Sequence, residues 1–282
     1  MQSPLSKRLF VRAIIESGPG LFSGRTLVGN TTLAAAEQAG VKYAESKGAH
    51  SLAELRALPS RELAALDAPA RPITDGWVLP ENNRRVSEVP VINGMTADDI
   101  GIPGGGARTP VTVGSYQSDS KKNFGAEADT FLELYPATAD SDVPQQRKIS
   151  ARARARVSIN LWAADQMKLS PRVYTYYFSR PIPWPQHPEF GAFHGAELPY
   201  VFNNLKTLDR PWQPADRTLA DQMSSYWVNF AKTGNPNGKG LPVWAPVDKN
   251  SHATMELGAH AGPMPLADSA RLAFWREFLA KP

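Results

Sequence analysis

Residues 173–178 read Val-Tyr-Thr-Tyr-Tyr-Phe, an unbroken run of β-branched and aromatic side chains that begins soon after Pro171. Side chains of these types favour extended backbone, so this run is the clearest strand of the sequence. Two more apolar runs, at residues 9–15 and 89–92, have the length of buried strands. Each is followed by a turn signal, Gly18-Pro19-Gly20 in one case and Asn93-Gly94 in the other. The sequence therefore predicts at least three buried strands.

Helical patterns separate these strands. Residues 51–66 begin with Ser51 and Glu54, the spacing of a capping box, whereas residues 101–120 are rich in Gly, Thr, Ser and Pro and predict an irregular loop. Strands that alternate with helices indicate an α/β fold with a mostly parallel sheet, although three strands are few for so many helices. The segments predicted to be helical are 31–47, 51–66, 126–135, 145–167, 218–232 and 269–280.

The composition is that of a globular protein. The chain has 282 residues, of which 42% are hydrophobic and 21% charged, and it has no cysteine. This composition excludes a collagen-like, a disordered or a disulfide-bonded chain, and the lack of cysteine excludes thiol catalysis and Cys-ligated zinc. No segment approaches the ~18 apolar residues that a membrane span needs, and the first residues lack the apolar core of a signal peptide.

The net charge of +4 gives little support for nucleic-acid binding. The densest basic run alternates with alanines inside the predicted helix 145–167, and no aromatic side chains are interleaved that could stack on bases. We therefore expect a solvated helix face rather than a phosphate-binding stripe. The run consists of Arg147, Lys148, Arg152, Arg154 and Arg156.

Among the five histidines, His194 has the most suggestive surroundings. It stands between Phe193 and Gly195, with Ala192 and Ala196 next to them, so that small residues leave the imidazole accessible. A general base needs this access because it must come within ~3 Å of the proton that it removes. A packed or capping histidine is the alternative. The histidines form no HExxH pattern, so no metal site is expected.

Two adjacent acids, Asp98 and Asp99, follow the predicted strand 89–92 and its turn. Reactive groups collect at the carboxyl ends of parallel strands, so a carboxylate here could orient a histidine. An acidic pair at a helix N-terminus explains the same residues without any chemistry. A nucleophile is harder to find: no serine stands in a G-x-S-x-G elbow, and Ser17, the nearest match, has Ile15 where the turn needs glycine. We interpret Ser17 as structural.

Several segments together resemble the C-terminal part of a type-B carboxylesterase, the α/β-hydrolase family of carboxylesterases, p-nitrobenzyl esterases and cholinesterases. The most specific segments are GAFHGAELPYVF at residues 191–202 and YWVNFAKTGNPNG at residues 226–238. Others are SPLSKRLFVRAIIESG, LAELRALPSREL, TDGWVLPE, VPVINGMTADD and RVYTYYFSR.

The resemblance implies a serine, acid and histidine triad in that order along the chain. Its histidine corresponds to His194 and its acid to Asp99, with Asp in place of the commoner Glu and an extra Ile100 before the glycine. Asp98 is the alternative because the aspartate side chain has a shorter reach than glutamate. Ser17 corresponds to a second, noncatalytic serine near the triad. The resemblance places the nucleophile and the oxyanion loop before residue 1. It therefore implies one domain over residues 1–282, the C-terminal portion of an α/β-hydrolase fold with an incomplete sheet and flanking and cap helices.

The implied activity is hydrolysis of small carboxylic esters through an acyl-enzyme, with no metal or cofactor. Because the serine is missing, we expect this chain to be inactive by itself. It would then be a fragment of a longer esterase or one half of a split esterase whose other half is a separate polypeptide. A noncatalytic cholinesterase-like binding module is the alternative, although such a module has no need of His194 and Asp99. The compartment is left open: secreted or periplasmic if a signal peptide precedes the chain, otherwise cytoplasmic.

Overall fold

The computed structural model describes residues 1, 3–18, 31–63, 73–79, 88–99, 111–170, 172–248 and 253–280. The chain divides into two compact units. The first consists of Met1–Phe10 and Arg25–Ser87, and the second of Val11–Gly24 and Glu88–Pro282. This division into units does not test the expectation of one domain over residues 1–282, which stays a prediction.

The second unit contains a five-stranded sheet whose spatial order follows the sequence. Neighbouring strands are parallel from β1 to β4, and β5 is antiparallel to β4. The expected α/β class with a mostly parallel sheet is confirmed. Strands β4 and β5 are two strands that the sequence patterns did not predict. The strands are β1 (Ala13–Glu16), β2 (Val91–Thr96), β3 (Val173–Phe178), β4 (Ala253–Leu257) and β5 (Gly262–Pro265).

The prediction of a turn at Asn93-Gly94 is wrong, because both residues lie inside β2 and are fully or almost fully buried. A side chain at Gly94 would have its Cβ only 2.1 Å from the ring of Tyr176 on β3. Glycine is needed here for close packing against that ring rather than for a turn. The strand thus runs on to Thr96 and carries the chain to the acidic pair at its end.

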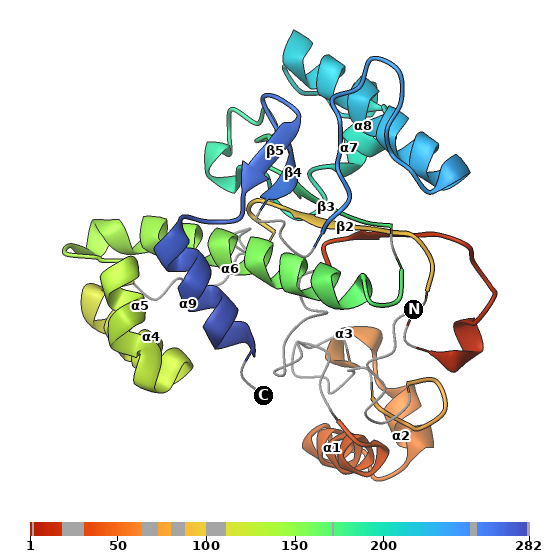
Figure 1. Ribbon diagram of the computed structural model, residues 1–282. Coiled ribbons are helices and arrows are strands. Elements are labelled where there is room, and N and C mark those ends of the chain that lie inside the picture. The colour runs from red at the N-terminus through yellow and green to blue at the C-terminus, as the bar shows by residue number, and fades with distance from the viewer. Residues whose placement is uncertain are drawn as a thin grey trace. The chain divides into compact units, whose positions relative to one another are not determined.

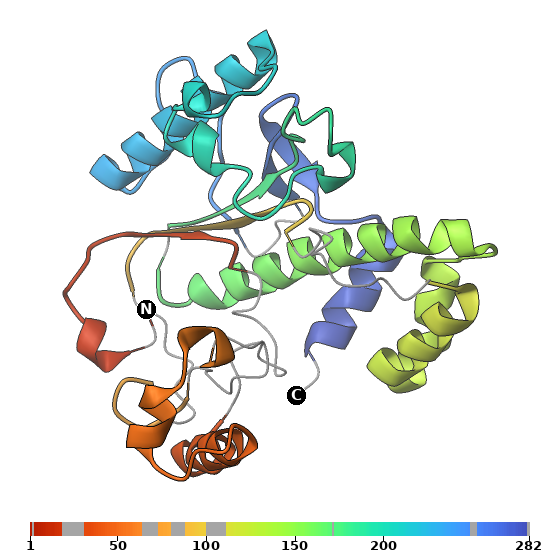
Figure 2. The ribbon, with the colours of Figure 1, turned by 180° about the vertical axis from the view of Figure 1, so that it is seen from behind.

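Helices cover both faces of this sheet (Figure 1). The long helix α6 lies along one face of β2 and β3, and α7 and α8 lie on the opposite side, an arrangement that the reverse view in Figure 2 shows equally well. The helices of this unit are α4 (Val113–Phe124), α5 (Ala128–Leu134), α6 (Val143–Gln166), α7 (Leu198–Val201), α8 (Pro214–Thr233) and α9 (Ser269–Ala280). Its 3-10 turns are η3 (Gly125–Glu127), η4 (Asp140–Asp142), η5 (Pro188–Phe190) and η6 (Leu205–Thr207).

Helix α4 occupies part of the segment that was predicted to be an irregular loop. Thr112 caps it: its hydroxyl accepts a hydrogen bond from the Ser115 amide, and the Ser115 hydroxyl accepts one from the Thr112 amide. The carboxylate of Asp140 binds the Val113 amide at 2.7 Å. These acceptors satisfy amides at the helix start, so a Ser-rich and Gly-containing segment still forms a helix.

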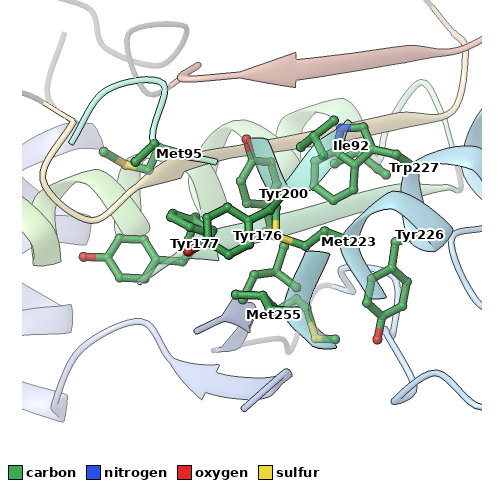
Figure 3. Packing of buried hydrophobic residues seen from close by; sticks show 14 of the residues in the cluster. Ile92, Met95, Tyr176, Tyr177, Tyr200, Met223, Tyr226, Trp227 and Met255 are labelled. Carbon is green, nitrogen blue, oxygen red and sulfur yellow. The ribbon is translucent and has the colours of Figure 1, made fainter. Parts of the chain in front are cut away.

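The main hydrophobic core lies between the sheet and its helices (Figure 3). Ile92 and Tyr176 of the sheet pack in one cluster with Tyr200, Met223 and Trp227 from α7 and α8. Rings meet edge to face, as in the pair of Tyr176 and Trp227, whose centroids are 5.2 Å apart. A second cluster joins α4, α5, α6 and α9 through Tyr116, Phe131, Tyr135, Val157 and Trp275.

The first unit contains η1 (Pro4–Ser6), α1 (Leu33–Ser46), α2 (Leu52–Ala57) and α3 (Ser60–Leu63). The Ser51 hydroxyl accepts from the Glu54 amide, which confirms Ser51 as the N-cap of α2. The Glu54 carboxylate accepts from the amide of His50, at 2.6 Å, instead of closing the predicted box on Ser51. The hydroxyl of Tyr43 on α1 donates to the carbonyl of Leu63 at 3.0 Å.

The expectation that the basic run of α6 is a solvated face is wrong for Arg152 and Arg156. Arg156 Nε donates to the Leu266 carbonyl at 2.7 Å, and its guanidinium lies 4.8 Å from the ring centroid of Tyr177. Arg152 binds the carboxylate of Asp98, as described below. Among the described residues, no helix combines the length and hydropathy that crossing a bilayer requires.

Candidate active site

The carboxyl ends of β1 and β2 carry Ser17 and the pair Asp98 and Asp99, which brings the sequence-predicted residues to one edge of the sheet. β1 ends at Glu16 and β2 at Thr96, and the two strands are in parallel register with Glu16 beside Gly94. Beyond β2, the Ala97 amide donates to the Phe178 carbonyl at the end of β3, at 2.8 Å. The three parallel strands therefore present their carboxyl ends side by side, where α/β proteins place reactive groups.

His194 contacts Asp99 at this edge through its ring nitrogen Nδ1 and the carboxylate oxygen Oδ1. The Asp99 side chain is 5% exposed, whereas the His194 side chain is 65% exposed. A carboxylate on Nδ1 favours the tautomer with the proton on that nitrogen and leaves Nε2 as the basic atom. The pair can therefore accept a proton from a group that approaches the exposed side of the ring.

Ser17 lies on the other side of the same carboxylate. Its hydroxyl donates to Asp99 Oδ1 at 3.2 Å, and its amide donates to the Gly94 carbonyl at 2.8 Å. Its backbone has a φ of 64°, which is uncommon for a residue with a side chain. The structure thus places Ser17 against the acid, and its hydroxyl hydrogen bond goes to Asp99.

The side chain of Asp98 contacts helix α6 instead of the imidazole. Its carboxylate accepts hydrogen bonds from Arg152, with Nη2 at 2.6 and 2.9 Å, and lies 3.2 Å from Lys148 Nζ. It also accepts from the backbone amide of Ala192, at 3.0 Å. The two adjacent acids therefore have different partners, and in the described structure the imidazole contact belongs to Asp99.

Glu197 is a buried acid near this pair that sequence reasoning missed. It is 1% exposed, its Oε1 accepts from the Tyr176 hydroxyl at 3.4 Å, and its Oε2 has no hydrogen-bond partner among the described residues. Burial, with repulsion from the carboxylates of Glu16 and Asp99, raises the pKa of Glu197 to about 7. The signal in the sequence was its place three residues after His194.

No group of three or more His, Cys, Asp or Glu side chains suited to a metal ion occurs in the described ranges. Of the other histidines in those ranges, His187 stacks on Phe190 with ring centroids 4.9 Å apart, and His50 and His260 are exposed. His252 lies outside the described residues.

Comparison with known proteins gives a consistent result. A family model described as the carboxylesterase family matches residues 1–275. Human cocaine esterase is 26% identical over 98% of this chain and 54% of its own length. Fumonisin B1 esterase of Sphingopyxis macrogoltabida is 29% identical over 93% of this chain and 51% of its own length, and mouse acylcarnitine hydrolase is 27% identical over 98% and 54%. The chain spans about half the length of these curated relatives.

Proposed function

This chain belongs to the carboxylesterase family, and from that premise we propose that it carries the general base and the orienting acid of a serine ester hydrolase. The base is His194 and the acid is Asp99. The observation that carries the proposal is the contact of His194 Nδ1 with Asp99 Oδ1 at the carboxyl ends of the parallel strands. Asp99 rather than Asp98 takes the role of the acid because Asp98 is already bound by Arg152 and Lys148.

In the proposed reaction, Nε2 of His194 removes the proton from a serine hydroxyl as that oxygen attacks the ester carbonyl. The imidazolium that forms is stabilised by Asp99, and it then returns the proton to the leaving alcohol. The acyl-enzyme is hydrolysed by water in a second round, with His194 again acting as the base. Each step uses the exposed side of the ring, opposite the nitrogen that Asp99 holds.

The nucleophile is proposed to come from outside these 282 residues. No serine in the sequence stands in a G-x-S-x-G elbow, and the Ser17 hydroxyl is hydrogen-bonded to Asp99. A longer chain or a second polypeptide would supply the serine and the oxyanion donors, and the chain alone would then be inactive. The substrates are proposed to be small carboxylic esters, since the family is that of carboxylesterases and relatives are named for cocaine, fumonisin B1 and acylcarnitine.

The proposal can be tested with a chimera in which this chain replaces the half of fumonisin B1 esterase that it matches. Hydrolysis of p-nitrophenyl butyrate should fall about 10³-fold or more in His194→Ala and strongly in Asp99→Asn. His260→Ala, a change at an exposed histidine, is the matched control and should keep full activity.

Two outcomes would contradict the proposal. A folded, active chimera that is indifferent to His194→Ala would remove His194 from the mechanism. Hydrolysis by the 282-residue chain alone that disappears in His194→Ala would place the nucleophile inside this chain. Thermal unfolding is recorded for each variant. A variant without a cooperative transition has lost activity because it does not fold.

A further inference from the structure

Asp98 makes several ion pairs and hydrogen bonds that an alternative triad acid would not need. Arg152 binds it through Nε at 3.1 Å and through Nη2 at 2.6 Å, and Lys148 adds a second cation at 3.2 Å. Its side chain is 5% exposed, whereas those of Arg152 and Lys148 are about one-third exposed, at 33% and 37%. A buried carboxylate is tolerated only when it is paired and hydrogen-bonded, and this one is paired twice.

The same residue also holds the backbone that leads to His194. The Asp98 amide donates to the Ala192 carbonyl at 2.8 Å, and the Ala192 amide donates to Asp98 Oδ2 at 3.0 Å. Both backbone polar groups of Ala192 are therefore taken by Asp98. A parallel β-bridge pairs Asp98 with Phe193. The residues that follow these two in the sequence are Asp99 and His194, which contact each other.

Gly191 shows how closely this loop approaches the carboxylate. Its φ of 57° favours glycine, and a Cβ built there would lie 2.2 Å from Asp98 Oδ2 and 3.6 Å from Lys148 Nζ. The loop therefore has room for glycine alone at this position. This fit is independent of the ion pairs and concerns the same carboxylate oxygen that binds the Ala192 amide.

The exposure of His194 makes such an anchor necessary. Its side chain is 65% exposed, so little packing holds the ring, and its contact with Asp99 depends on where the backbone places it. A misplacement of about 1 Å is enough to impair a catalytic group. The two cations of α6 also neutralise Asp98, so that Asp99 is left as the acid that pairs with the imidazole.

We propose that Asp98, bound by Arg152 and Lys148 of α6, is a positioning residue that sets His194 against Asp99 through the backbone of Ala192. The proposal rests on the proposed function for its catalytic meaning, but the structural coupling can be measured without activity. Helix α6 is then a part of the site, acting through Asp98 rather than by contact with a substrate.

The test uses NMR of the 282-residue chain, following the Nδ1 proton of His194 and the hydrogen exchange of the Ala192 amide. The Nδ1 proton is assigned by its loss in His194→Gln. In Arg152→Gln we expect this resonance to broaden or move upfield and the Ala192 amide to exchange about tenfold faster or more. Arg152→Lys keeps a cation at this position and should restore both signals in part.

Arg147→Gln is the matched control because it removes an ion pair of the same length from the same helix, the 2.6 Å contact of Arg147 with exposed Asp119. It should leave both signals unchanged. If Arg152→Gln does not fold, the same two signals are measured in Lys148→Gln. This variant removes one cation and leaves the Arg152 pair in place.

The outcomes separate the two proposals. Lack of a hydrogen-bonded Nδ1 proton in the unaltered chain would contradict the pair of His194 and Asp99, and with it the proposed function. A normal Nδ1 proton that stays unchanged in Arg152→Gln and Lys148→Gln, with only a lower unfolding temperature, would overturn the positioning role of Asp98 alone.

Discussion

Ser17 donates its hydroxyl proton to Oδ1 of Asp99, the same carboxylate oxygen that contacts Nδ1 of His194. One oxygen thus receives a hydroxyl from the end of β1 and an imidazole from the loop before α7. A carboxylate held from two sides has less freedom to rotate away from the ring than one held by the histidine alone.

Substitutions at Ser17 should separate its hydrogen bond from its backbone strain. Ser17→Ala loses the bond to Asp99 and keeps a side chain at a φ of 64°, so we expect it to lower the free energy of unfolding by about 1 kcal/mol. Ser17→Gly loses the same bond but relieves the left-handed backbone, worth roughly 1 kcal/mol. Urea denaturation of both variants measures the difference, and a Gly variant less stable than the Ala variant would refute the assignment of strain.

Glu197 should make stability depend on pH. Its pKa of about 7 in the folded protein lies above the ordinary value of 4.5, so the folded state binds more protons between these two values. The contribution of Glu197 to stability is therefore greatest below about pH 4.5. It is lost as the pH rises through 7, and this loss lowers the free energy of unfolding by roughly 3 kcal/mol in total.

Glu197→Gln cannot ionise and should lose this fall in denaturation curves recorded from pH 5 to 8. Glu133→Gln, at an exposed position of α5, is the control and should keep the pH dependence of the unaltered chain. Identical pH profiles for the chain and for Glu197→Gln would show that Glu197 is ionised in the usual range.

Gly94→Ala should be strongly destabilising because the new Cβ would lie 2.1 Å from the Tyr176 ring, which is itself packed against Trp227. We expect a loss of about 2 kcal/mol or more, since overpacking a filled core costs roughly 1–3 kcal/mol. Gly114→Ala in α4 is the control: its nearest neighbour would be 3.9 Å away, and alanine favours helix. Thermal unfolding of both variants tests this, and equal stability would argue against the close approach of β2 and β3.

The buried pair of Arg180 and Asp216 should matter more for stability than any exposed ion pair. Asp216 is fully buried and accepts from Arg180 Nε at 2.6 Å and from the Tyr200 hydroxyl at 3.0 Å. Burial alone would raise the pKa of Asp216, but these bonds, above all the one from Arg180, leave it below its ordinary value.

Arg180→Met should lower the free energy of unfolding by about 3–5 kcal/mol, because it leaves a buried carboxylate without its cation. Lys168→Met breaks an exposed, solvent-screened pair with Asp165 and should change the free energy of unfolding far less. Chemical denaturation compares them, and similar losses in the two variants would count against a special role of the buried pair.

Elements with strong local patterns could be predicted from the sequence. The strand 173–178 and the helix 269–280 have the predicted bounds, and the fold class followed from the alternation of such elements. Strand β5 could not be predicted because Pro263 and Pro265 argue against a strand, and only its place at the sheet edge makes them acceptable. Asn93-Gly94 has the sequence of a turn, but the ring of Tyr176, far along the chain, requires glycine in a strand.

The candidate site shows the same division. His194 and Asp99 could be selected because one has small neighbours and a motif and the other follows a strand, and their assigned roles stay predictions. The partners of Asp98 could not be selected, since Arg152 and Ala192 are 54 and 94 residues away and their side-chain and backbone groups meet only in the fold. The raised pKa of Glu197 likewise depends on burial, which a single carboxylate in a motif does not reveal.

The two proline residues of β5 have a consequence for how this sheet can grow. Proline has no N–H group, and Pro263 and Pro265 occupy alternate positions of an edge strand. Among the described strands, the rim at β5 therefore lacks two backbone donors that a further strand could use, whereas β1, the opposite rim, consists of Ala, Ile, Ile and Glu and contains no proline. The two rims of the described sheet thus differ in their capacity to pair with a further strand, and β1 has the greater capacity.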